Sequence, residues 1–192
     1  MIFWIASYPK NGNTWLRALI SAYYYSKDGI FNQADLKNIG QFPERSHFVN
    51  FDYNMLEITD TTKFWIEAQE KINKDNKLRF FKTHNIFGAV NDFKFTNKKN
   101  SAGCIYIVRD PRNVITSLKN HYELDDTQAL EWMTNSKKFI YDVENATKNG
   151  YSDFQLISSW SANYKSWKTQ NEIPIKIIRY EDLLNETYVV FK

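Results

Sequence analysis

The sequence predicts an α/β fold with a central, mostly parallel sheet flanked by helices. Short apolar runs alternate with longer segments whose apolar residues recur at helical spacing, which is typical of strand–helix–strand units. The chain has 192 residues, enough for one domain with its own core and too few for two. It contains no internal repeat and no Gly-, Ser- or Pro-rich linker, so we expect a single domain.

Each expected element follows from its local pattern. Strands are expected at the short apolar runs Ile2–Ser7, Leu78–Lys82, Gly103–Val108 and Ile173–Arg179. Helices are expected at Thr14–Tyr25, Lys63–Asn73, Pro111 to about Tyr122, Asp126–Asn135, Lys137–Thr147 and Phe154–Gln170. Asp110 is the expected N-cap of the helix that Pro111 opens. The polar stretch Thr96–Ser101 is expected to be a loop, and Tyr180–Asp182 a turn.

Composition excludes several classes of protein. Hydrophobic residues make up 43% of the chain and aromatic residues 17%, which excludes intrinsic disorder. The net charge of +3 weakly favours anionic ligands and does not indicate a nucleic-acid-binding protein. The single cysteine, Cys104, excludes an internal disulfide and a cysteine-based zinc site, and we interpret it as a buried thiol. No His, Cys and Asp cluster has metal-ligand spacing, so no metal is expected.

The first residues predict the cellular location. Residues 1–6 are apolar, but Pro9 and Lys10 follow almost at once. A signal peptide has a basic start and a longer apolar region, and a membrane span needs about 20 apolar residues. We therefore expect a cytoplasmic protein without a membrane span.

The loop between the first strand and the first helix is a candidate anion site. Residues 7–15 read S-Y-P-K-N-G-N-T-W. The unpaired N–H groups and the dipole of a helix N-terminus favour phosphate or sulfate. Gly12 permits a tight backbone, Lys10 adds positive charge, and Asn13 and Thr14 add donors. The loop lacks the G-x-x-x-x-G-K-S/T pattern of a Walker A motif. The alternative is a plain strand–helix loop with a capping Asn or Thr.

A second strand–helix junction has the same character. Residues 105–113 read I-Y-I-V-R-D-P-R-N, which places Arg109 at the carboxyl end of a strand, where ligands bind in open α/β sheets. Ser117 lies eight residues further on, about two helical turns away. An arginine can bind a phosphate through two N–H groups while a serine adds another donor. The alternative is a structural ion pair of Arg109 with Asp110 or Glu181.

The tripeptide Lys82-Thr83-His84 follows a predicted strand and offers catalytic groups. Histidine suits a general base because its ordinary pKa lies near neutrality. Lys82 supplies a positive charge that can offset charge developing on oxygen. The alternative is a structural histidine, and this is the interpretation we give to His47 and His121.

Together these motifs resemble those of the sulfotransferase family. Residues 8–15, Y-P-K-N-G-N-T-W, resemble the family's 5′-phosphosulfate loop, Y-P-K-S-G-T-T-W. The R-D-P-R run from Arg109 with Ser117 resembles its 3′-phosphate motif, and K-T-H resembles the segment with its catalytic histidine. Trp160, Asn163 and Trp167 resemble its W-x-x-H-x-x-x-W helix, with asparagine for the histidine. The resemblance extends from Phe3 to about Val190, and it includes a Y-E-D-L turn at residues 180–183 that we interpret as structural.

The resemblance implies a three-layer fold like that of the P-loop NTPases and a nucleotide sulfate donor, 3′-phosphoadenosine 5′-phosphosulfate. The 5′-phosphosulfate would be held by Lys10, Asn11, Gly12, Asn13 and Thr14. Trp15 would pack on the adenine, and Arg109 and Ser117 would hold the 3′-phosphate. His84 would be the general base for sulfuryl transfer to a hydroxyl or amine, and Lys82 and Lys10 would supply positive charge. The family reaction needs no metal.

Family members usually continue beyond the length of this chain, into a basic R-K-G-type loop that closes over the nucleotide. Residues 1–192 are therefore expected to form one sulfotransferase domain that is shortened at its C-terminus relative to the family. One alternative is a nucleotide-binding fragment with impaired catalysis. Another is a P-loop kinase-like phosphotransferase, which would need a G-K-S/T loop. Residues 30–55 and 87–99 are the expected acceptor loops, suited to a phenol, a lipid or a sugar, and the sequence does not define an oligomeric state.

Overall fold

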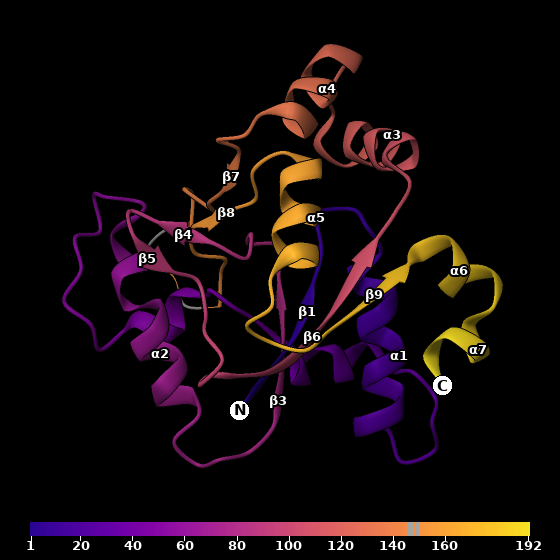
Figure 1. The fold of residues 1–192 in the computed structure, drawn as a ribbon, viewed down its shortest axis with the longest axis horizontal. Helices are drawn as coiled ribbons and strands as arrows, with labels where there is room; N and C mark the ends of the chain where they lie inside the picture. Colours follow the sequence, from indigo (N-terminus) through magenta and orange to yellow (C-terminus); the bar gives the residue numbers. More distant parts are fainter. Residues whose placement is uncertain (146–147, 149) are drawn as a thin grey trace.

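A five-stranded sheet forms the centre of the computed structural model, which describes residues 1–145, 148 and 150–192 (Figure 1). The strand order is β2-β3-β1-β6-β9, and all neighbouring strands are parallel. In this order the strands are β2 (Gly40–Gln41), β3 (Arg79–Thr83), β1 (Ile2–Ala6), β6 (Ser101–Val108) and β9 (Ile175–Arg179). The predicted parallel α/β sheet is confirmed.

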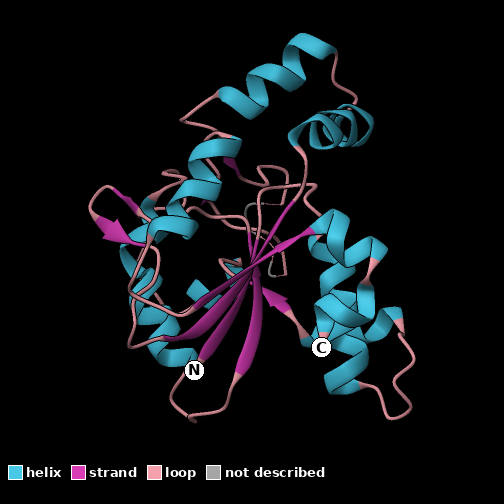
Figure 2. Ribbon diagram, turned by 45° about the vertical axis from the view of Figure 1, so that its right-hand side comes forward, coloured by secondary structure: helices cyan, strands magenta, loops and turns pink. Residues whose placement is uncertain are grey.

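Helices cover both faces of this sheet (Figure 2). The α-helices are α1 (Asn13–Tyr25), α2 (Trp65–Ile72), α3 (Pro111–Tyr122), α4 (Asp126–Thr134), α5 (Trp160–Thr169), α6 (Tyr180–Asn185) and α7 (Thr187–Phe191). Short 3-10 helices lie at Gln33–Asn38, Arg45–Phe48 and Asp60–Phe64. Two small antiparallel pairs complete the fold, β4 (Ala89–Val90) with β5 (Phe93–Lys94) and β7 (Phe139–Ile140) with β8 (Gln155–Leu156). None of the described helices has the length and apolar character that crossing a membrane requires.

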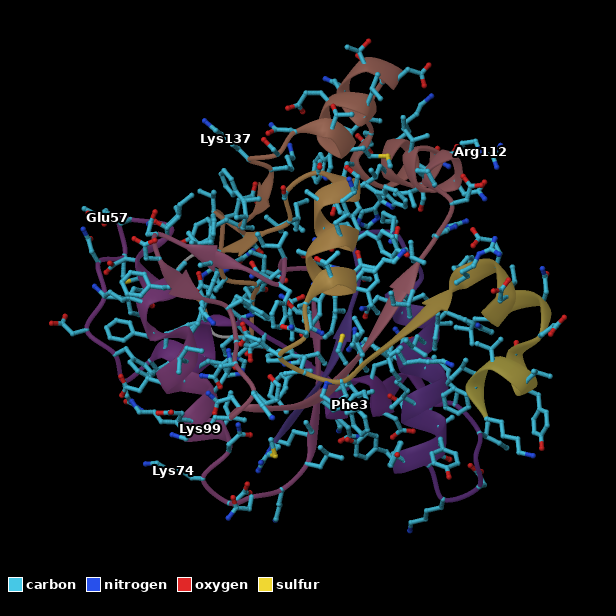
Figure 3. All side chains as sticks on the ribbon, in the orientation of Figure 1. Phe3, Glu57, Lys74, Lys99, Arg112 and Lys137 are labelled. Carbon is cyan, nitrogen blue, oxygen red and sulfur yellow. The ribbon has the colours of Figure 1, made fainter. Side chains whose placement is uncertain are left out.

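Alternating side chains of the strands build a separate core on each face of the sheet. On one face Trp4 packs with Trp65 of α2 and Trp167 of α5 in a cluster rich in aromatic residues. On the other face Ile5 packs with Leu16 of α1 and Leu183 of α6. Exposed charged side chains such as Glu57, Lys74, Lys99 and Lys137 lie at the periphery (Figure 3). The fold therefore has three layers, with helices on both sides of a buried sheet.

Two predicted helices differ from the structure. The segment predicted as a helix at Lys137–Thr147 instead contains β7, which pairs with β8; its residues 146 and 147 lie outside the described part. The helix predicted at Phe154–Gln170 begins only at Trp160, because Ser159 is its N-cap and accepts a hydrogen bond from the Ala162 N–H. Phe139 and Ile140 fit a helical pattern of apolar residues in the sequence, but their pairing with β8 makes them extended. Tyr180–Asp182 is the first turn of α6 rather than an isolated turn.

The parallel sheet brings the ends of several strands to one edge. The loop after β1 leads into α1, His84 directly follows β3, Arg109 directly follows β6, and Tyr180 directly follows β9. Asp110 is confirmed as the N-cap of α3, since its side chain accepts a hydrogen bond from the Arg112 N–H at 2.9 Å. The motifs recognised in the sequence therefore meet at the carboxyl edge of the sheet.

Candidate active site

A cleft of about 480 Å³ lies at this edge of the sheet. The predicted residues that line it are Lys10, Gly12, Asn13, Thr14, Trp15, Lys82, His84, Arg109 and Ser117. Asn11 is the one predicted site residue that does not line it. Further lining comes from Gln41, His121, Tyr122, Ile140, Ser152, Gln155 and Tyr180. Residues from distant parts of the chain thus share one concave site, which is the usual form of a small-molecule site.

Gly12 shapes the loop after β1. It has a φ of 97°, and a Cβ added to it would lie 2.2 Å from Cδ2 of Tyr180. Any side chain at this position would be strained and would collide with the Tyr180 ring. Gly12 is also the N-cap of α1 and provides no side-chain cap. Neither Asn13 nor Thr14 is the cap, so the plain capped loop is not what forms, and none of the described side chains caps the amides at the start of α1.

The two asparagines of the loop have their side chains inside the protein. Asn11 is fully buried, with Nδ2 3.5 Å from the carbonyl oxygen of Ile107. Asn13 is 5% exposed, and its Nδ2 donates to the carbonyl of Ile5 at 3.0 Å and to Oγ of Ser7 at 3.2 Å. These contacts fasten the loop to β1 and β6. The groups that the loop presents to the cleft are therefore chiefly backbone amides together with Lys10, Thr14 and the half-exposed Trp15.

Arg109 lies in the cleft without a carboxylate partner among the described residues. Its Cζ lies 4.6 Å from the centroid of the Tyr180 ring, and its Nη1 lies 3.4 Å from the carbonyl oxygen of Lys10. Its Nε is buried and has no hydrogen-bond partner in the described part of the chain. An arginine held by stacking, with unused donors, is suited to bind an anion through its guanidinium.

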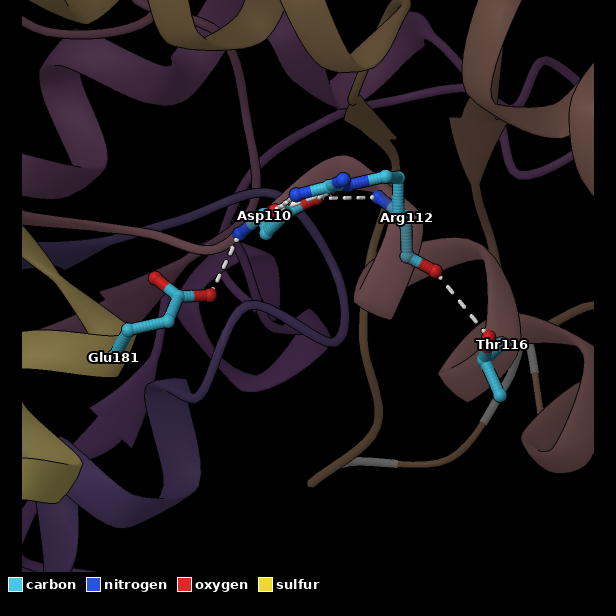
Figure 4. A network of polar contacts seen from close by, with 4 residues as sticks. All are labelled: Asp110, Arg112, Thr116 and Glu181. Atoms are coloured by element: carbon cyan, nitrogen blue, oxygen red, sulfur yellow. Dashed lines mark hydrogen bonds and ion pairs between the residues drawn. The ribbon is translucent and has the colours of Figure 1, made fainter.

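The carboxylates that could have paired with Arg109 are used elsewhere (Figure 4). Asp110 forms an ion pair with Arg112, with Oδ2 2.5 Å from Nη2, and Arg112 lies at the outer surface. Glu181 accepts a hydrogen bond from the Asp110 N–H at 2.9 Å. The alternative of a structural ion pair between Arg109 and Asp110 or Glu181 is therefore wrong. Ser117 of α3 lines the cleft with Arg109, and His121, one turn later on the same helix face, lines it too.

His84 is held so that one ring nitrogen remains available. The backbone N–H of His84 donates to Oε1 of Gln155 at 2.8 Å, and its backbone carbonyl accepts from Nδ2 of Asn163 at 2.9 Å. Its Nδ1 lies 2.7 Å from the carbonyl oxygen of Ser7. Because a carbonyl only accepts, Nδ1 carries the proton and Nε2 keeps its lone pair. Burial, and then the charge of Lys82, hold the pKa of His84 well below its usual value, which favours the neutral ring.

Positive charge accumulates beside this histidine. Burial, followed by the charges of Arg17 and Lys10, lowers the pKa of Lys82 to about 8. Burial, followed by the charge of Arg109, lowers the pKa of Lys10. None of these four cations forms an ion pair with a carboxylate in the described part of the chain. Unpaired cations that repel one another favour the binding of a polyanion.

Some residues of the site were not predicted as such, and some predicted residues lie elsewhere. Tyr180, predicted to be structural, forms a wall of the cleft against Gly12 and Arg109. Of the expected acceptor loops, only Gln41 contributes to the lining. His47 is buried against Phe42, with 5.1 Å between ring centroids. No group of three or more His, Cys, Asp or Glu residues that could hold a metal ion occurs among the described residues.

Known proteins are similar to this chain over almost its whole length. Luciferin sulfotransferase of Photinus pyralis is 24% identical over 191 residues, which cover 98% of this chain and 48% of that protein. Sulfotransferase 1B1 of Canis lupus familiaris is 24% identical over 184 residues, which cover 93% of this chain and 52% of that protein. The chain therefore spans about half the length of these curated relatives.

Solved structures share the fold. Mouse sulfotransferase SULT7A1, complexed with PAP, superposes with a TM-score of 0.50 at 17% identity, covering 97% of this chain and 53% of that one. Retinol dehydratase, in a complex with retinol and PAP, gives a TM-score of 0.51 at 16% identity, covering 97% and 56%. The model of the sulfotransferase domain family matches residues 2–191. With nearly every residue inside that match, the chain belongs to the sulfotransferase family.

Proposed function

We propose that this protein binds 3′-phosphoadenosine 5′-phosphosulfate and transfers its sulfuryl group to a hydroxyl or amine, with His84 as the general base. The observation that carries this proposal is the composition of the cleft. Within the described part of the chain, one cavity combines a histidine whose Nε2 has no hydrogen-bond partner, cations without carboxylate partners, and a helix N-terminus that lacks a side-chain cap. These are the groups that a polyanionic donor and a proton-releasing acceptor require.

The strand order supports a donor site and an acceptor site on opposite sides of β1. On one side of β1 lie strands β6 and β9. The loop amides at the start of α1 offer a site for the 5′-phosphosulfate, and Arg109 with Ser117 offers a site for the 3′-phosphate. Trp15 and Tyr180 offer aromatic surface for the adenine. His84 and Gln41 lie on the other side of β1, at the ends of β3 and β2, so we place the acceptor there. The acceptor is a small molecule, a carbohydrate or a lipid with a free hydroxyl or amine.

The chain's residues would support transfer as follows. The donor, when bound, supplies the sulfuryl group. Nε2 of His84 takes the proton of the acceptor as the acceptor's lone pair forms a bond to sulfur. The bond from sulfur to the bridging oxygen breaks, and its electron pair stays on the 5′-phosphate, giving 3′-phosphoadenosine 5′-phosphate. Lys10 and Lys82 stabilise the negative charge on these oxygens, and the loop after β1 holds the reacting groups in line.

The first test is calorimetric binding of 3′-phosphoadenosine 5′-phosphate, with 5′-AMP and ATP–Mg²⁺ as competitors. We expect the 3′-phosphorylated nucleotide to bind at least about 100-fold more tightly than 5′-AMP, because hydrogen bonds to charged groups contribute about 1.5–3 kcal/mol each. Turnover is then measured with hydroxyl and amine acceptors. Binding without turnover would favour the nucleotide-binding alternative, and preference for ATP–Mg²⁺ would favour the phosphotransferase.

The pH dependence of kcat/KM tests the protonation states. We expect the rate to fall at acid pH as His84 is protonated, with an apparent pKa below the usual histidine value, since burial disfavours the imidazolium. We expect it to fall again above pH of about 8, as Lys82 loses its proton. In the Lys82→Arg variant the alkaline limb should move upward, because arginine stays charged. A wild-type rate that keeps rising to pH 10 would contradict the role of Lys82.

A further inference from the structure

The side chain of Asn13 points into the protein, although the residue lies in the loop that lines the cleft. It is 5% exposed. Its Nδ2 donates to the carbonyl of Ile5 at 3.0 Å and to Oγ of Ser7 at 3.2 Å, one residue on each side of Ala6. The Asn13 amide thus fixes the end of β1 at two points, and both of its acceptors belong to that strand end rather than to the cleft.

Ser7 in turn fixes the ring of His84. Its carbonyl oxygen lies 2.7 Å and its Oγ 3.2 Å from Nδ1 of His84, while its N–H donates to the carbonyl of Thr83 at 3.2 Å. Ser7 is 1% exposed, so water does not compete for these groups. The position of the Ser7 carbonyl decides which ring nitrogen carries the proton, and therefore whether Nε2 can act as a base.

We propose that Asn13 is a positioning residue for His84, acting through Ser7, and that its side chain is not a ligand of the nucleotide. The proposal rests on the proposed role of His84 as general base. It assigns the loop after β1 two separate tasks. Backbone amides and Lys10 bind the donor, while the inward amide of Asn13 holds the strand end whose carbonyl sets the tautomer of the base. Groups that orient a metal-binding histidine typically change activity by about 10–100-fold when they are removed, and we expect a loss of the same order for a group that orients a catalytic histidine.

Two substitutions of nearly equal shape test the proposal. In Asn13→Thr a hydroxyl can still donate to the carbonyl of Ile5 or to Ser7, and in Asn13→Val a methyl group replaces that hydroxyl. We expect Asn13→Val to lower kcat by about 10–100-fold while the Kd for 3′-phosphoadenosine 5′-phosphate changes by less than about 3-fold. Asn13→Thr should keep kcat within about 5-fold of the wild type. If Asn13→Val weakens nucleotide binding as much as it lowers kcat, the side chain serves the nucleotide and the proposal is wrong.

A spectroscopic measurement tests the same point without turnover. Long-range ¹H–¹⁵N spectra of the imidazoles report the tautomer, and comparison with His84→Gln assigns the signals of His84. The wild type and Asn13→Thr should show the Nδ1-protonated form, and Asn13→Val a mixture of tautomers. A single Nδ1-protonated form in Asn13→Val would overturn the proposal. Lack of turnover by the wild type would instead count against the proposed function, and the tautomer would still decide the role of Asn13.

A second variant covers the case in which Asn13→Val does not fold. Ser7→Ala removes one of the two acceptors of Asn13, and with it the Oγ that lies 3.2 Å from Nδ1 of His84, but keeps the carbonyl that lies 2.7 Å from that nitrogen. We expect a smaller loss of kcat, about 3–10-fold, with nucleotide affinity unchanged. Ser21→Ala is the matched control, because Ser21 is fully buried and its Oγ has no partner among the described residues. Equal effects of the two serine substitutions would contradict the proposal.

Discussion

Replacing His84 with glutamine is expected to lower kcat for sulfuryl transfer by about 10²–10⁴-fold, the range that a general base contributes. Glutamine fills similar space and can hydrogen-bond, but it has no group that takes a proton near neutral pH. The Kd for 3′-phosphoadenosine 5′-phosphate should change by less than about 3-fold, since the base acts on the acceptor and gives mainly transition-state stabilisation. Initial rates and calorimetry on the same preparation separate the two effects.

His47→Gln is the matched control for this experiment. The ring of His47 accepts a hydrogen bond from the Glu44 N–H and stacks on Phe42, and the residue does not line the cleft. We expect this variant to keep kcat within about 3-fold, because a glutamine side chain can still accept the hydrogen bond from the Glu44 N–H. A His84→Gln enzyme with normal kcat would show that another group takes the proton and that His84 is not the general base.

The fold followed from the sequence where local pattern and tertiary packing agree. The run Gly103–Val108 is apolar enough to be a buried strand, and Pro111 after Asp110 marks the start of a helix, so β6 and α3 lie close to their predicted positions. Parallel strands bring their carboxyl ends to one edge, which is why motifs far apart in the sequence were expected to meet. Where pairing with a distant segment overrides the local pattern, as at Phe139 with Leu156, the predicted helix was wrong.

The sequence predicted which residues form the candidate site better than it predicted the contacts around them. The sequence left Arg109 with two possible carboxylate partners, because spacing alone does not show that Arg112 pairs with Asp110. It also did not show that the side-chain amide of Asn13 donates to Ile5 and Ser7, since an exposed amide and a buried amide in a loop have the same sequence pattern. The Tyr180 wall depends on a contact with Gly12 across the sheet edge, which no local signal carries. These are long-range contacts, whereas motif matching identifies residues one segment at a time.

The second large effect is expected at Arg109. Arg109→Ala should weaken the binding of 3′-phosphoadenosine 5′-phosphate by about 100-fold, because hydrogen bonds to charged groups contribute about 1.5–3 kcal/mol each and the guanidinium can form two. Binding of 5′-AMP, which lacks the 3′-phosphate, should change by less than about 3-fold, so discrimination between the nucleotides is lost. Competition calorimetry on wild type and variant measures both affinities.

Arg112→Ala provides the matched control from the same R-D-P-R motif. The Arg112 side chain is 88% exposed and paired with Asp110, so both affinities should stay within about 2-fold of the wild type. The affinity of Arg109→Lys for 3′-phosphoadenosine 5′-phosphate should lie between those of the wild type and Arg109→Ala, because lysine keeps the charge but loses the bidentate donor geometry. Loss of 5′-AMP binding equal to the loss of 3′-phosphoadenosine 5′-phosphate binding would place Arg109 at the shared 5′-phosphate or in the stacking on Tyr180. Removing Arg109 also relieves the repulsion that contributes to the lowered pKa of Lys10, and this change affects the binding of both nucleotides. The ratio of the two affinities therefore isolates the 3′-phosphate contact better than either affinity alone.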